Sequence, residues 1–166
     1  MSSSVIRYLQ TPTIFGRIDD ERWEEIVHHN LRPREQDEGK TSFWEHSNKQ
    51  EKRHILAANA ARKNNKDRIM AVSLSNQLFE EAWAELLDEP DDKNFSCIAE
   101  LHRSGLLEDD QTRTRLLEEI RSRFETDAVD DISMSRGKVG ELVKDVIEEC
   151  DHIEWDKAGE WASNLP

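Results

Sequence analysis

Apolar residues along this chain recur three or four positions apart, which is the spacing of the buried face of a helix. Three segments show the pattern most clearly, namely residues 20–29, 110–124 and 135–150. In the last of them the apolar face comprises Val139, Leu142, Val143, Val146, Ile147 and Cys150. An aspartate or serine at the start of each segment supplies a helix cap, so we expect three helices here.

The middle of the chain carries a similar pattern over longer stretches. Residues 43–63 include an alanine-rich run, 57–61, with strong helix propensity. Between residues 69 and 87 the apolar positions at helical spacing are Ile69, Val72, Phe79, Trp83 and Leu86. We therefore expect a helix in each stretch, the second ending before Pro90, and a short helix from Asn94 to Gly105.

These expectations combine into an all-α fold, a compact helical bundle of five to seven helices in a single domain, residues 1–166. Its N-terminal third is partly irregular, with an arm or short strand in residues 1–17 and a polar loop in residues 30–42. The C-terminal tail, residues 153–166, is expected to pack on the bundle. Four prolines and six glycines are too few for a β protein with many turns.

Composition limits the class of protein. Charged residues make up 36% of the chain, but five tryptophans and five phenylalanines supply material for a core, so we expect a folded domain. Cys97 and Cys150 lie far apart and form no CxxC motif, which is typical of a reducing compartment and disfavours a zinc finger. The sequence shows no secretory signal and no apolar run of membrane-spanning length. We expect a cytoplasmic protein with no membrane segment and no cofactor.

Charge is distributed unevenly along the chain. Residues 40–68 hold eight bases and three acids, a net charge of +5, whereas the whole chain carries −13, which leaves −18 for the remainder. The basic residues at the centre of this stretch could contact nucleic-acid phosphates. They are Lys49, Lys52, Arg53, Arg62, Lys63, Lys66 and Arg68. The alternatives are a solvated helix face, a face that docks on the protein's own acidic helices, and a contact surface for an acidic protein partner.

The strongest acidic segment is the second candidate site. Residues 80–92 contain seven acids and no base. These acids are Glu80, Glu81, Glu85, Asp88, Glu89, Asp91 and Asp92. Such a surface attracts a basic partner and speeds its association, although acidity also serves solubility alone.

Paired carboxylates and tryptophans offer weaker signals. Acids three positions apart, as in Glu85 and Asp88, resemble the magnesium ligands of helical hydrolases, but 36 acids produce such spacings by chance. We therefore expect no metal site and no catalytic residues. Trp23 and Trp83 lie on apolar stripes and are predicted in the core. The tryptophans better placed to anchor a partner are Trp44, Trp155 and Trp161.

Three functions remain open. The favoured one is a non-catalytic interaction protein that docks to a larger macromolecular partner, as an accessory subunit or as an inhibitor or immunity-type protein. The alternative is a nucleic-acid-binding subunit of a nucleoprotein complex that uses residues 49–68. The third is a magnesium-dependent all-α nucleotide hydrolase.

Overall fold

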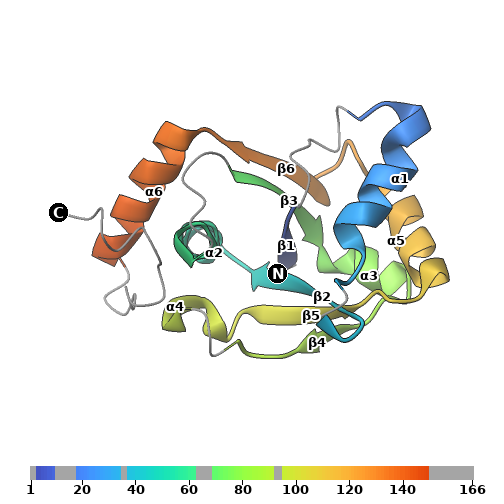
Figure 1. Ribbon diagram of the computed structural model, residues 1–166, viewed down its shortest axis with the longest axis horizontal. Helices are drawn as coiled ribbons and strands as arrows, with labels where there is room; N and C mark the ends of the chain where they lie inside the picture. Colours follow the sequence, from blue (N-terminus) through green and yellow to red (C-terminus); the bar gives the residue numbers. More distant parts are fainter. Residues whose placement is uncertain (1–2, 10–17, 35–36, 63–68, 92–94, 150–166) are drawn as a thin grey trace.

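The computed structural model describes residues 3–9, 18–34, 37–62, 69–91 and 95–149. Its strands are β1 (Ser4–Tyr8), β2 (Lys40–His46), β3 (Ile69–Ser75), β4 (Leu86–Asp88), β5 (His102–Leu106) and β6 (Val129–Met134). Its helices are α1 (Asp20–Leu31), α2 (Lys49–Arg62), α3 (Asn76–Glu81), α4 (Ser96–Ala99), α5 (Asp110–Ser122) and α6 (Arg136–Glu149). Strands and helices alternate throughout (Figure 1).

Within the described residues, six strands form one sheet in the order β4-β5-β2-β1-β3-β6. Every neighbouring pair is antiparallel. Strands β2, β3 and β4 therefore run in one direction, and β1, β5 and β6 run in the other. As a consequence, the C-terminal ends of β2, β3 and β4 lie at the same end of the sheet as the N-terminal ends of β1, β5 and β6.

Helices cover both faces of this sheet (Figure 1). On one face, α2, α4 and α6 pack over a core that includes Ile6 and Trp44. On the other face, α1, α3 and α5 pack over a core that includes Val5 and Phe43. Because successive residues of a strand point to opposite faces, Val5 and Ile6 enter different cores. The fold is therefore a three-layer α/β/α arrangement with two apolar cores.

The prediction of an all-α helical bundle is wrong, because an antiparallel sheet occupies the centre of the molecule. Residues 69–87, predicted as one helix, form strand β3, the short helix α3 and the start of β4. Strand β3 has helices over both faces, and all but its last residue are buried. A strand buried on both faces lacks polar alternation, so its continuous apolar run is compatible with a helix pattern.

Two other predicted helices are also partly strand. The stretch 43–63 begins within β2 and becomes helical only at Lys49, where α2 starts. The stretch 94–105 contains the four-residue helix α4 followed by β5. In both stretches the strand is too short for its period of two to outweigh the helical signal of its neighbours. For residues 1–17, where an arm or a short strand is expected, the structure shows the short strand, which is the inner strand β1.

The three strongest helix predictions are confirmed as α1, α5 and α6. Their apolar faces are buried, as in Trp23 and Val27 of α1 and Leu116 and Ile120 of α5. The predicted polar loop, residues 30–42, is shorter than expected because α1 extends to Leu31 and β2 begins at Lys40. The tail, residues 153–166, lies outside the described residues. No helix in the described part of the chain is long and apolar enough to cross a membrane.

Two glycines allow the packing of the sheet to be tested. A Cβ atom on Gly105 of β5 would lie 2.7 Å from the ring of Phe43, which is fully buried edge-to-face against Phe79. We expect Gly105→Ala to lower the free energy of unfolding by about 1–3 kcal/mol, because the ring has little room to move. Gly140→Ala on α6 is the matched control, since nothing lies within 4 Å of its Cβ position. It should stabilise the protein by about 0.5–1 kcal/mol in urea unfolding. Equal effects of the two substitutions would contradict this packing.

Candidate functional site

Trp83 stands apart from every other large apolar side chain that the structure describes. Trp83 is 81% exposed, and it is the only large hydrophobic residue that is exposed in the described part of the chain. Its backbone adopts φ +56°, a left-handed conformation that residues with a Cβ atom adopt at a cost. The sequence-based placement of Trp83 in the core is therefore wrong, because the predicted helix ends at α3 and the chain turns outward at this residue.

Hydrogen bonds on both sides fix this turn. The amide of Ala84 donates to the Phe79 carbonyl at 2.8 Å, so the chain closes immediately after Trp83. Arg115 of α5 donates its Nε–H to the Ala82 carbonyl at 2.9 Å, and its guanidinium lies 5.7 Å from the Trp83 ring centroid. The exposed indole is thus held on a defined turn rather than on a loose loop.

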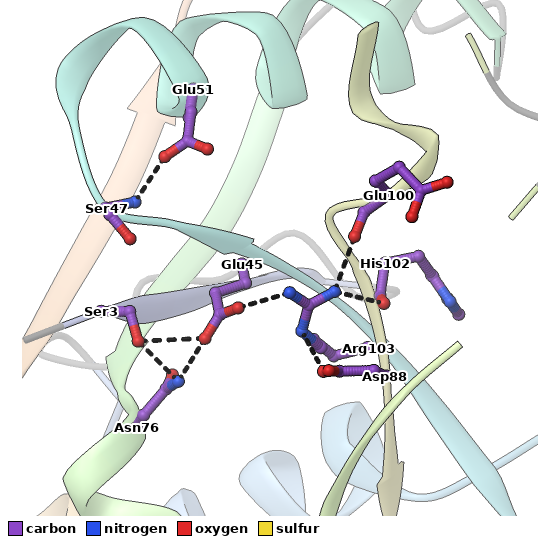
Figure 2. Close-up of polar contacts among 9 residues, drawn as sticks. All are labelled: Ser3, Glu45, Ser47, Glu51, Asn76, Asp88, Glu100, His102 and Arg103. Atoms are coloured by element: carbon purple, nitrogen blue, oxygen red, sulfur yellow. Dashed lines mark hydrogen bonds and ion pairs between the residues drawn. The ribbon is translucent and has the colours of Figure 1, made fainter. Parts of the chain in front are cut away.

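Five polar residues meet near this turn, at the end of the sheet where β2, β3 and β4 finish and β1 and β5 begin. Figure 2 shows Ser3, Glu45, Asn76, Asp88 and Arg103 directed toward one another. They come from the residue before β1, the end of β2, the residue after β3, the end of β4 and the start of β5. The antiparallel topology alone brings these distant positions together.

Arg103 is the centre of this network (Figure 2). Its guanidinium contacts Glu45 at 2.6 Å and Asp88 at 2.8 Å, and it donates to the carbonyls of Glu100 and His102. The side chains of Arg103 and Glu45 are only 15% and 22% exposed, so water screens their attraction weakly. Ion pairs of this geometry fix both side chains firmly.

Glu45 is ionised at neutral pH. Partial burial by itself raises the pKa of Glu45, but hydrogen bonds from Asn76 and Ser3, together with the charge of Arg103, lower it below its ordinary value. Asn76 donates at 2.6 Å and Ser3 at 3.0 Å to the same carboxylate oxygen. The side-chain amide oxygen of Asn76, Oδ1, is buried and accepts no hydrogen bond from the residues that the structure describes.

A cavity of about 280 Å³ opens between this network and the Trp83 turn. Its apolar lining consists of Phe79, Ala84 and Leu86, and its polar lining of Glu45, Asn76, Glu80, Asp88 and Arg103. Three carboxylates face one guanidinium, so the lining carries two net negative charges.

The structure divides the predicted acidic site into paired and unpaired groups. Glu81 pairs with Arg123, Asp88 with Arg103, and Glu89 with Lys40. Glu80 and Glu85, on either side of Trp83, form no ion pair with any residue of the described chain. Asp91 lies beyond β4, and Asp92 is outside the described residues. The segment therefore places unpaired carboxylates before and after Trp83 in the sequence instead of forming one acidic helix, while the guanidinium of Arg115 lies against the ring.

Of the predicted basic site, the structure describes the side chains of Lys49, Lys52 and Arg53, and two of these form partly exposed ion pairs within the chain. Lys52 pairs with Asp130 at 3.1 Å and Arg53 with Asp145 at 3.7 Å, and the second half of α2 is buried. Lys49 is exposed at the start of the helix. The other predicted members are Arg62, whose side chain is not described, and Lys63, Lys66 and Arg68, which lie outside the described residues.

The remaining candidates are not brought together. Glu85 and Asp88 do not share a helix face, because β4 begins at Leu86. Among the described residues no group of three or more metal-ligating side chains converges. Trp44, predicted as a partner anchor, is buried in the core, while Trp155 and Trp161 lie outside the described residues.

Sequence reasoning overlooks Asn76 and Arg103 altogether. Asn76 follows the largely apolar stretch 69–74, which is a weak signal, and Arg103 lies among polar residues with no signal of its own. Comparison with protein-family models, curated proteins and solved structures found no match. Function is therefore inferred from the residues of the site.

Proposed function

We propose that this chain is a non-catalytic interaction protein that docks to a basic surface of a larger protein through the corner between α3 and β4. Trp83 carries this proposal, because an indole that is 81% exposed on a fixed turn is costly to retain unless something covers it. Tryptophan is also enriched among the residues that dominate binding energy at protein interfaces.

The surrounding charge supports a basic partner. Glu80 and Glu85 flank Trp83 in the sequence without ion-pair partners in the described chain, and the cavity that Glu80 lines is net negative. The whole chain carries −13, so its field draws positively charged surfaces toward it and repels nucleic acid. An accessory subunit and an inhibitor or immunity-type protein both require such a surface.

The other two functions lack this kind of support. Lys52 and Arg53 are engaged by Asp130 and Asp145, which favours an internal role for the basic stretch. The helical hydrolase requires an all-α fold that the sheet replaces. The spacing of the two cysteines favours a reducing compartment, so we propose a cytoplasmic partner.

Charge reversal tests the proposal. In this experiment the wild-type protein is immobilised and incubated with an extract of the cells that make it. We expect it to retain a basic protein in stoichiometric amount and to release that protein as the salt concentration is raised. Glu80→Lys combined with Glu85→Lys should slow association with that protein about tenfold or more at low salt. Glu21→Lys combined with Glu25→Lys on α1 is the control, with the same change in net charge on exposed residues of another helix. Equal losses in both variants would show that only net charge matters and would contradict the proposed surface.

A further inference from the structure

We infer that the cavity beside Trp83 receives a basic side chain, an arginine or a lysine, of the docked protein. This inference rests on the proposed function and specifies what enters the site. The cavity volume of about 280 Å³ is sufficient for one long side chain. Ala84, the residue that follows Trp83 in the turn, is part of its lining, so the cavity and the indole belong to the same corner of the molecule.

The lining matches the two parts of such a side chain. Phe79, Ala84 and Leu86 offer apolar contact for an alkyl stem. Glu80 and Asp88 are exposed carboxylates at the polar part of the lining, and Glu80 has no ion-pair partner in the described chain. A cation between them would reduce the net charge of −2 without displacing Arg103.

The protein's own Arg103 shows that this wall binds a guanidinium. It lies between Glu45 and Asp88, which hold it at 2.6 Å and 2.8 Å. The contact with Asp88 leaves much of that carboxylate accessible, because its side chain is 81% exposed. The buried oxygen of the Asn76 amide is a further acceptor on the same wall that no described residue satisfies.

An NMR titration of the full chain tests the inference without the partner. The probes are the N-acetyl amides of arginine, lysine and citrulline, the last being the neutral match of arginine. We expect the arginine or the lysine probe to shift the side-chain signals of Asn76 and Arg103 saturably, and citrulline to leave them unchanged. The response of the two cationic probes decides between a guanidinium and an ammonium group.

Matched variants locate the effect. Glu80→Gln should weaken binding of the cationic probe about two- to fivefold, as expected for one exposed charge. Glu118→Gln on α5, an exposed acid outside the lining, should leave it unchanged. Equal shifts with citrulline, shifts spread over the whole acidic surface, or no shift at low salt would each overturn the inference. Because the probes need no partner, the two experiments fail independently. A negative titration overturns the cavity inference but not the proposed docking surface, and a negative capture experiment overturns the docking surface but not probe binding in the cavity.

Discussion

Trp83→Gly is expected to weaken partner binding roughly 30-fold or more while changing the stability of the fold by no more than about 1 kcal/mol. Loss of an indole at the centre of an interface costs at least about 2 kcal/mol, roughly a 30-fold loss of affinity. The fold itself gains from the change, because glycine adopts φ +56° without the steric cost of about 1–2 kcal/mol that a Cβ atom imposes. Against this gain stand the greater chain entropy of glycine and the lost contact with Arg115, each about 0.5–1 kcal/mol.

These opposing terms leave the free energy of unfolding within about 1 kcal/mol of wild type. Trp83→Ala is the informative comparison, because it removes the ring and keeps the left-handed conformation. It should lose binding as fully as the glycine variant while unfolding at lower urea concentration. Binding is measured by calorimetry with the captured protein, and stability by urea unfolding. A glycine variant that binds like wild type would remove Trp83 from the interface.

The helices α1, α5 and α6 could be predicted from the sequence because, in the described residues, each buries one face only. In α5 and α6 the apolar residues of that face recur every three or four positions with polar residues between them, and this pattern predicts a helix directly. Strand β3 offers no such contrast, since both of its sides are buried. The polar network is harder still, because Glu45, Asn76 and Arg103 are neighbours only through the strand order.

Trp83 illustrates a different limit of sequence reasoning. At helical spacing after Phe79 it looks like a core position, and only the turn after α3 reveals that it points outward. The basic stretch in residues 40–68 has two interpretations in the sequence. It is either an external contact surface or a surface that pairs with the protein's own acidic residues. The pairs Lys52 with Asp130 and Arg53 with Asp145 favour the second, because the basic helix lies beside acidic residues of β6 and α6.

Arg103→Met is expected to be the most destabilising change in the polar network. It leaves Glu45 ionised, mostly buried and without its cation, and we expect a loss of about 2–4 kcal/mol in the free energy of unfolding at pH 7. Arg34→Met is the control, because Arg34 contacts Asp37 at a similar 2.8 Å but is 56% exposed. That change should cost less than about 1 kcal/mol. The comparison separates the effect of burial from that of distance.

The pH dependence of this loss identifies Glu45 as its source. In the wild-type protein the pKa of Glu45 is lowered on folding, so its stabilising contribution is complete above the pKa of the unfolded chain and disappears as pH falls through the folded pKa. Without Arg103 that lowering weakens while burial still raises the pKa of Glu45, so acid neutralises the unpaired carboxylate earlier. The difference in unfolding free energy between wild type and Arg103→Met should therefore shrink between pH 7 and about pH 4. In a Glu45→Gln background Arg103→Met should cost less and lose most of this pH dependence, with a coupling energy of about 1–3 kcal/mol. A penalty that is the same at both pH values and in both backgrounds would show that Arg103 acts through packing alone.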